Sequence, residues 1–466
     1  MKIFYALIVF VFYALDYHVE AQVSFKHFTL SRQASANTQI VDLDRDGKKD
    51  ILMVNRSSDT SIVWYQNMGN GYFSPAKQIW NAGRNNLYYS ESIALADFNN
   101  DGHLDFAADN YYGQNALAFI NDGSQNFRRT VASHIGGEFF GINTVDVNND
   151  DYPEIVASGR IFNNTKGVFD SVGTKLSLFG YSTISHDFDG DSFEDIAQYT
   201  NNNKIVFYQN NTNGGFNAPK TIDSLLKFGY YYMSLCDLDA DNNVDILYPS
   251  STYFPNSDNI MKWYKSNGKG TFTIHNLLVV DTNYVVTSIF AADINSDGQK
   301  DLVASMYVRG NNKGAVRCFW NQGGNVFDSS KYQVVTTAIN YPVFVRVEDI
   351  DSDGDQDILT ASFGGPGGMA WFQNQSIPNT TGLNEHTVYQ PLVYPNPLTS
   401  ETTLSFSEEQ KNTTIKIIDL FGKEIRSHNF NGKEFILKRG ELINGIYFLQ
   451  ILDEHRNLTN KKIVIE

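Results

Sequence analysis

The sequence predicts an all-β chain, in which a seven-bladed β-propeller is followed by a small C-terminal β-sandwich. Three observations predict this fold. A nine-residue acidic pattern occurs seven times at spacings of 41 to 56 residues, so the chain is built from repeated units. Short runs rich in Ile, Val and Leu flank each copy, as expected for strands. After Gln375 the repeats end and the composition changes.

The N-terminus has the features of a signal peptide. Lys2 precedes an apolar run from Ile3 to Leu15, and the sequence Val19-Glu20-Ala21 resembles a signal-peptidase site. The run is shorter than the roughly 20 apolar residues that a membrane-spanning helix needs. We therefore expect residues 1–21 to be removed on export, and we expect no membrane span.

The acidic pattern is D-x-[DN]-x-D-x-x-x-[DE], and its first copy is DLDRDGKKD from Asp42. It offers side-chain oxygens at positions 1, 3, 5 and 9, which suits Ca²⁺, a hard cation that takes roughly six to eight oxygen ligands. Position 6 holds Gly, Asp, Ser or Asn, and glycine there allows a turn with positive φ. The last acid stands at position 9 and strands flank the loop, so it differs from an EF-hand.

We number these acidic loops 1 to 7 along the chain. Their predicted calcium ligands, loop by loop, are Asp42, Asp44, Asp46 and Asp50; Asp97, Asn99, Asp101 and Asp105; Asp146, Asn148, Asp150 and Glu154; Asp187, Asp189, Asp191 and Asp195; Asp237, Asp239, Asp241 and Asp245; Asp293, Asn295, Asp297 and Asp301; Asp349, Asp351, Asp353 and Asp357.

Each repeat contains the strands of one propeller blade. Runs such as SIALA before loop 2 and FAA after it form one hairpin. About twenty residues later, an apolar strand, an Asn/Gly turn and a strand opened by phenylalanine form a second hairpin, as in WYQNMGNGYF from Trp64. The seventh repeat lacks its last strand, and Ser24–Leu30 has the matching sequence. We expect this N-terminal strand to close the ring and so remove an exposed edge.

The loops and the strands behind them resemble the FG-GAP or VCBS repeats of integrin α-subunit propellers and of many secreted bacterial proteins. The resemblance assigns residues 22–375 to the propeller and implies up to seven bound Ca²⁺. The net charge of −16 excludes a typical nucleic-acid partner, because phosphate binding needs a basic surface. Most of that charge is ligand charge, since residues 387–466 hold ten Lys or Arg and ten Asp or Glu. The two cysteines, Cys236 and Cys318, lie in apolar runs and are expected to be buried thiols.

The C-terminal segment has its own signature. Residues 376–386 form a polar linker, and residues 387–466 alternate between strands and short turns. The motifs YPNP, KIIDLFGKEI, LINGIYFLQI and KKIVIE in this segment resemble the C-terminal sorting domain of type IX secretion in Bacteroidota. The resemblance implies a partner in the type IX secretion machinery and a location in the medium or on the outer cell surface. An adhesive sandwich that stays on the protein is the alternative.

The residues that give ligand specificity are expected on the face opposite the acidic loops. The segments predicted there are rich in aromatic residues, with Asn and Arg beside them, and such groups stack on and hydrogen-bond to sugars. The alternative is that these aromatics wedge adjacent blades together. The candidate ligand-binding residues are Arg56, Tyr88, Tyr111, Tyr112, Tyr231, Tyr253 and Arg309.

The sequence favours a monomeric binding or adhesion module for a glycan or a protein partner. The alternative is a propeller-type polysaccharide lyase or another carbohydrate-active enzyme. We find no Ser-His-Asp order, P-loop or zinc-ligand spacing, and the sequence assigns no catalytic residue. Enzymatic activity stays open, because a site can be assembled from different blades.

Overall fold

The computed structural model divides the chain into two compact units, Met1–Ser376 and Ile377–Glu466. The residues that it describes are 23–33, 35–55, 61–69, 71–81, 92–110, 115–134, 141–176, 178, 180–224, 226, 232–251, 259–311, 313–362, 368–376, 392–394, 396–419, 423–452 and 458–465. The predicted signal peptide and nearly all of the predicted linker lie outside these residues.

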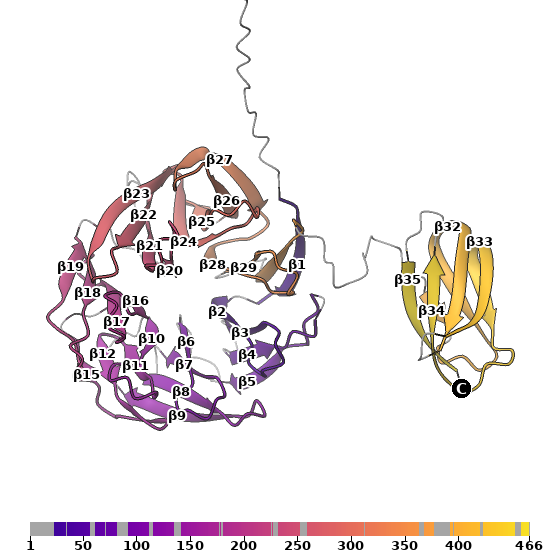
Figure 1. Cartoon of the computed structure of the whole chain (residues 1–466), viewed down its shortest axis with the longest axis horizontal. Helices are drawn as coiled ribbons and strands as arrows, with labels where there is room; N and C mark the ends of the chain where they lie inside the picture. Colours follow the sequence, from indigo (N-terminus) through magenta and orange to yellow (C-terminus); the bar gives the residue numbers. More distant parts are fainter. Residues whose placement is uncertain are drawn as a thin grey trace, which may run out of the picture. The chain divides into compact units, whose positions relative to one another are not determined.

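The first unit contains seven four-stranded antiparallel sheets arranged in a ring (Figure 1), which we call blades 1 to 7. The first four blades consist of β2 (Ser35–Val41), β3 (Asp50–Asn55), β4 (Ser61–Tyr65) and β5 (Lys77–Asn81); β6 (Ile93–Ala96), β7 (Asp105–Asn110), β8 (Asn115–Asn121) and β9 (Phe127–His134); β10 (Ile142–Val145), β11 (Glu154–Ala157), β12 (Arg160–Phe162) and β15 (Thr174–Lys175); β16 (Gly180–His186), β17 (Asp195–Thr200), β18 (Ile205–Tyr208) and β19 (Lys220–Asp223).

The last three blades complete the ring. They consist of β20 (Ser234–Cys236), β21 (Asp245–Ser250), β22 (Asn259–Ser266) and β23 (Phe272–Val280); β24 (Tyr284–Ala292), β25 (Asp301–Val308), β26 (Gly314–Asn321) and β27 (Phe327–Thr336); β28 (Pro342–Glu348), β29 (Asp357–Ser362), β30 (Met369–Asn374) and β1 (Phe25–Ser31).

Burial explains why the middle strands of a blade are apolar along their whole length. Every residue of β3 and β4 is buried, whereas the outer strand β5 is largely exposed. The core clusters lie between blades, and one of them combines Leu52 and Trp64 of blade 1 with Phe106 and Phe119 of blade 2. Both faces of a middle strand therefore pack against neighbouring blades, as in stacked sheets.

The N-terminal strand closes the ring, as the sequence predicts. β1 pairs with β30 in an antiparallel register that runs from Phe25 opposite Asn374 to Ser31 opposite Met369. Figure 1 shows β1, the indigo strand, beside the last blade. The Phe28 ring stacks on the Trp371 indole at a centroid distance of 4.6 Å, so aromatic contact reinforces the hydrogen bonds.

The prediction that phenylalanine opens the fourth strand holds in blades 2, 5 and 6 and is wrong in blades 1 and 4. There Phe73 and Phe216 form only isolated bridges with Asn67 and Asn210. The strands β5 and β19 begin four residues later, at Lys77 and Lys220. Both segments contain a proline just before the strand, FSPAK and FNAPK, and proline lacks the N–H that pairing needs.

Blade 3 also departs from the predicted pattern. A two-stranded hairpin, β13 (Asn164–Thr165) and β14 (Val168–Phe169), lies between β12 and β15. The fourth strand of this blade is only two residues long. Phe169 of β14 packs edge-on against Phe98 of blade 2 at 5.1 Å, so this phenylalanine fills the interblade core from the extra hairpin rather than from the fourth strand.

The second unit consists of five strands in one hydrogen-bonded sheet, β31 (Leu392–Tyr394), β32 (Glu401–Ile418), β33 (Glu424–Lys438), β34 (Gly445–Leu452) and β35 (Leu458–Ile465). Register shifts between Ser405 and Thr413 split β32 into two parts. The first part pairs with β31 and the second with β34. Residues of both parts, Leu404 and Ile417 among them, share one core, so the sheet folds over on itself as a small β domain.

Two further sequence expectations can be compared with the described residues. Cys236 and Cys318 are buried free thiols, as predicted. Within the residues that the structure describes, no helix has the length and apolarity to cross a membrane.

We predict that Trp371→Ala weakens ring closure. Its indole is fully buried, and it contacts Phe28 of β1 and Phe73 of blade 1. Truncating a buried Trp costs about 3–5 kcal/mol, so the free energy of unfolding in urea should fall by that amount. Met68→Ala, at an exposed side chain, is the matched control and should change it by less than about 0.5 kcal/mol. Equal unfolding curves for the two variants would contradict the closure described above.

Candidate metal centres

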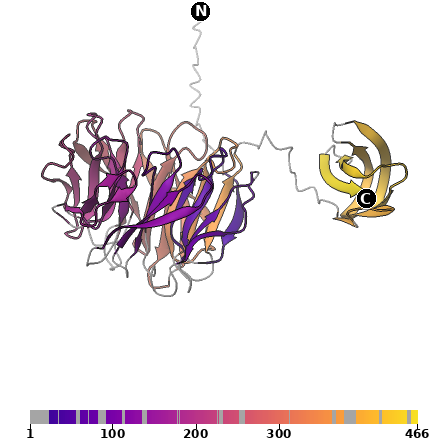
Figure 2. The same ribbon diagram turned by 90° about the horizontal axis from the view of Figure 1, so that it is seen from below.

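The seven acidic loops lie at one edge of the ring, because each joins the first and second strands of its blade. Figure 2 shows the blades from the side, with loops gathered at two edges. The sixth position of every loop has positive φ, including Asp151, Ser192 and Asn242, where glycine is absent. The fourth position also has positive φ in every loop, which the sequence analysis missed. All seven loops thus share one backbone conformation.

The first carboxylate of each loop organises this conformation. Its Oδ1 accepts the backbone N–H of position 5 at 3.0–3.2 Å. Its Oδ2 accepts the N–H of position 6 at 2.7–3.0 Å. Asp187 Oδ1 also accepts the Gly190 N–H at 2.7 Å. Every other one of these oxygens keeps a second lone pair, so these carboxylates can still coordinate a metal ion.

The ninth-position carboxylate is the most buried acidic group of each loop, with at most 1% exposure. One oxygen accepts the N–H of position 2 at 2.9–3.2 Å. In six blades the other oxygen accepts an N–H from the end of the third strand at 2.7–3.0 Å. One carboxylate therefore ties together three strands of its blade.

Burial shifts the titration of these ninth-position acids. Desolvation is the largest cause in all seven, and it raises the pKa of Asp50 to about 6, of Asp105, Glu154, Asp195 and Asp301 to about 7, and of Asp357 to about 9. The pKa of Asp245 is also raised. A bound divalent cation would favour the ionised form and so reverse this direction.

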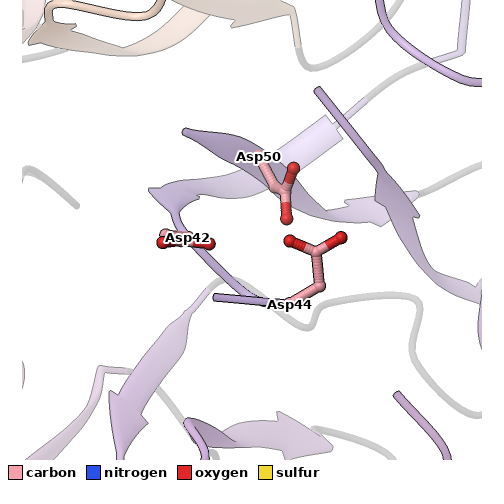
Figure 3. Close-up of side chains that lie close together, drawn as sticks. All are labelled: Asp42, Asp44 and Asp50. Atoms are coloured by element: carbon pink, nitrogen blue, oxygen red, sulfur yellow. The ribbon is translucent and has the colours of Figure 1, made fainter. Parts of the chain in front are cut away.

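Four of the loops bring three carboxylates together. The clusters are Asp42, Asp44 and Asp50; Asp187, Asp189 and Asp195; Asp237, Asp239 and Asp245; Asp349, Asp351 and Asp353, with the ligand atoms of each cluster within 4.8 Å of one another. Figure 3 shows the carboxylates of Asp44 and Asp50 turned toward each other in loop 1. Two oxygens bound to one Ca²⁺ at about 2.4 Å lie at most about 4.8 Å apart, so this geometry and the all-oxygen donor set are consistent with calcium loops.

The other three loops carry Asn at position 3. The side-chain amides of Asn99, Asn148 and Asn295 each donate to the fifth-position carboxylate at 2.9–3.1 Å. The amide oxygen accepts the N–H of position 5 in the same loops. These loops therefore contain one negative charge fewer and one additional internal hydrogen bond.

In three loops a glutamine that the acidic pattern does not predict supports the third-position aspartate. Gln66, Gln209 and Gln373, at the end of the third strand, donate to Asp44, Asp189 and Asp351 at 2.5–2.6 Å. Loops with Asn at position 3 have Ile120, Asn163 or Trp320 at the equivalent place. The signal in the sequence is the Gln of WYQN, FYQN and WFQN, which accompanies only loops with Asp at position 3.

In four blades the asparagine after this residue links the blade to its neighbour. The side-chain nitrogens of Asn67, Asn164, Asn210 and Asn374 donate at 2.8–2.9 Å to the second-position carbonyl of the preceding blade's loop. The same nitrogens donate to position 8 of their own loop at 3.0–3.1 Å. We call these four residues the asparagine clamps. Sequence reasoning identified them only as turn residues, although six of the seven repeats have asparagine at this place.

The structure describes only one of the seven candidate ligand-binding residues. Arg56, Tyr88, Tyr111, Tyr112, Tyr231 and Tyr253 lie outside the described residues. The guanidinium of Arg309 donates to the Thr282 carbonyl at 2.7 Å and to Asn259 Oδ1 at 3.0 Å, so it holds the turn before β24.

Some aromatic residues of the links between blades are described, and they pack inside the ring. Phe344 is buried. Tyr341 stacks on Tyr307 at 4.4 Å, and Tyr181 lies 6.1 Å from Tyr199. These three rings therefore agree with the alternative interpretation, in which aromatic residues of the links wedge adjacent blades together.

Two family models match parts of the chain. An FG-GAP-like repeat matches residues 42–108, which span loops 1 and 2. A secretion system C-terminal sorting domain matches residues 392–466, which contain β31 to β35. The chain thus carries an FG-GAP-like repeat region and a C-terminal sorting domain, as in type IX secretion cargo of Bacteroidetes. The sorting domain indicates secretion across the outer membrane to the cell surface or the medium.

The chain is similar to several known proteins. It is 31% identical over 75 residues to an endo-acting ulvan lyase of Formosa agariphila, a match that covers 16% of this chain and 14% of the lyase. The extracellular domain of the two-component system protein BT4673 of B. thetaiotaomicron matches with 10% identity and a TM-score of 0.50, over 95% of this chain and 59% of that one. The lectin BP39L of Burkholderia pseudomallei matches with 12% identity and a TM-score of 0.49, over 71% and 93%. At this identity the BT4673 likeness concerns the fold alone.

We predict that Asn210→Ala destabilises the ring. The change removes donors to the Val147 and Glu194 carbonyls and the acceptor of the Thr212 N–H. Leaving buried polar groups without partners costs about 1–3 kcal/mol each, so the free energy of unfolding should fall by at least about 2 kcal/mol. Asn213→Ala, at an exposed asparagine of the same turn, is the control. If both variants unfold at the same urea concentration, the clamp contributes no net stability.

Proposed function

Since the chain combines an FG-GAP-like repeat region with a sorting domain for secretion, we propose that it is a calcium-stabilised propeller that acts outside the cell as a binding or adhesion module. The occupant that fits best is a glycan. The supporting observation is that the carboxylates at the acidic edge have a structural role, because they accept hydrogen bonds from their own loops and strands. Specificity would then reside on the opposite edge.

Calcium would bind at positions 1, 3, 5 and 9 of the loops, with up to seven ions per chain. The converging carboxylates of four loops and the buried ninth-position acids support this proposal. Bound Ca²⁺ would neutralise the gathered negative charge and fix the turn between the first two strands of each blade. Its role would be structural.

The proposed ligand edge contains the end of the second strand and the start of the third, for example Asn55 of β3 and Ser61 of β4. Arg56, Tyr88, Tyr111, Tyr112, Tyr231 and Tyr253 belong to the segments that join strands there or link blades. Tyrosine rings stack on the apolar faces of sugars, and their hydroxyl groups bond to polar substituents. A protein partner is the second occupant that such an aromatic surface would accept.

The remaining parts of the chain have separate proposed roles. Residues 1–21 would direct export across the inner membrane, and residues 387–466 would engage the type IX secretion machinery. Residues 22–375 would be the binding domain, active as a monomer.

A polysaccharide lyase is the alternative function. The likeness to the ulvan lyase covers 75 residues. This length is far less than the seven blades, which extend from Phe25 to Asn374. The likeness therefore does not transfer a propeller-based activity to this chain, and lyase activity is an outcome that the binding experiment below must detect.

We predict that calcium stabilises the protein more at high pH than at low pH. In chelated protein the ninth-position acids have folded-state pKa values above those of the unfolded chain. The folded state then binds more protons between about pH 4 and pH 7, so chelated protein loses stability as pH rises through this window. Calcium keeps these acids ionised, so the gain in Tm from Ca²⁺ should be larger at about pH 7.5 than at about pH 5.5.

The check is differential scanning calorimetry with EDTA or excess Ca²⁺ at both pH values. Excess Mg²⁺ is the control for ionic strength and for divalent charge. A Tm that does not respond to chelation at either pH would refute structural calcium binding.

We predict that the calcium-loaded protein binds glycans through the proposed edge. Replacing Tyr111, Tyr112 and Tyr231 with Ala should reduce binding on a glycan array at least about tenfold and leave the Tm unchanged, because stacking on rings contributes about 1 kcal/mol or more per contact. Tyr72→Ala is the control, since Tyr72 is 65% exposed in the turn after the third strand, at the acidic edge. Unimpaired binding by the triple variant would reject this edge as the site. Absorbance of unsaturated sugar products, followed in parallel, would establish the lyase instead.

A further inference from the structure

Loop 5 differs from the other loops with Asp at position 3 in the residue that faces this aspartate. Loops 1, 4 and 7 use a neutral glutamine amide there. In loop 5 the equivalent residue is Lys265 of β22. Its Nζ contacts Asp239 Oδ2 and lies 3.0 Å from Asp241 Oδ2. The protein's own ammonium group therefore bridges the third and fifth positions of this loop.

The fifth position of loop 5 is also occupied on its other oxygen. Asp241 Oδ1 accepts both the backbone N–H and the side-chain amide of Asn243, each at 2.9 Å. Its Oδ2 faces Lys265. Donors from the protein thus occupy both oxygens of Asp241.

The link from blade 5 to blade 4 is built differently as well. Ser266 stands where other blades have asparagine, and its N–H still donates to Asp245 at 2.8 Å. The interblade bond comes instead from the Gly270 N–H, which donates to the Phe188 carbonyl at 3.0 Å. Blade 5 is therefore attached to loop 4 of the preceding blade through the backbone.

A calcium ion and the Lys265 ammonium would compete for the same oxygens. Asp239 and Asp241 each present an oxygen to Nζ, and two cations held within about 4 Å repel each other. A lysine ammonium is compact and remains charged at neutral pH. It can neutralise part of the loop's charge without any ion from solution.

We propose that Lys265 takes the place of a metal ion in loop 5, so that this loop is held by an internal cation and the chain binds one Ca²⁺ fewer than it has loops. The proposal rests on the proposed calcium binding of the other loops. The remaining cluster of Asp237, Asp239 and Asp245 retains the geometry of loops 1 and 4. Removing the ammonium should therefore create a metal site where none operates.

The test is a reciprocal exchange between loops 4 and 5. Lys265→Gln copies the glutamine of loops 1, 4 and 7, and Gln209→Lys puts an ammonium beside Asp189 of loop 4. Calcium per chain is counted by native mass spectrometry and by titration calorimetry on the full secreted chain, after removal of metal and reloading. We expect K265Q to bind one more ion than the wild type and Q209K to bind one fewer. The Tm of each loaded variant verifies folding.

The outcomes separate this proposal from the one on which it depends. A wild-type protein that binds no calcium refutes the calcium proposal itself. A wild-type protein that binds calcium, with unchanged counts in K265Q, refutes the role of Lys265. If K265Q does not fold, Q209K decides, since an unchanged count there shows that an ammonium does not displace calcium. Lys269→Gln, at an exposed lysine of the turn after β22, is the matched control and should leave the count unchanged.

Discussion

The buried carboxylate at the ninth position of each acidic loop is the group on which the blades depend. It lies at the start of the second strand, and its oxygens accept N–H groups from the loop and from the end of the third strand. Such a group is costly to bury unless its oxygens are satisfied. The requirement to satisfy it fixes where three strands of a blade begin or end, and so it sets the register of the whole sheet.

The contacts between blades follow from the same arrangement. The asparagine clamp stands next to the residue that supports the third-position aspartate, and it reaches the loop of the preceding blade. Metal-binding geometry and interblade contact thus share a few consecutive residues at the end of the third strand. Blade 5 differs from blades 1, 4 and 7 at both of these consecutive positions, Lys265 and Ser266.

The sequence predicts the repeat, the loops and the ring closure because each depends on local pattern. Residues such as Asp42 and Asp50 recur at fixed spacing, and the missing strand of blade 7 has a visible counterpart before Ser31. The clamps were not predicted, because the partner of Asn210 is a carbonyl of another blade. Pro75 and Pro219 delay the start of two strands that the preceding phenylalanine was predicted to open. The links between blades contain both aromatic residues that pack in the ring and aromatic residues that are ligand candidates. The sequence pattern alone cannot separate a ring that packs from a ring that faces a partner.

The pairing of β1 with β30 places both chain ends of the propeller at one point of the ring. Phe25 lies opposite Asn374, and the Gln375 N–H donates to the Ser24 carbonyl at 2.9 Å. A protease cut after Ser376 would release the second unit without unpairing any strand of a blade. The adjacent ends would also permit circular permutation of the ring through a short linker. Tension applied between the two ends would separate the β1–β30 pairs one after another, starting at Phe25. The pairing that closes the ring would therefore be the first part of the propeller to break under force.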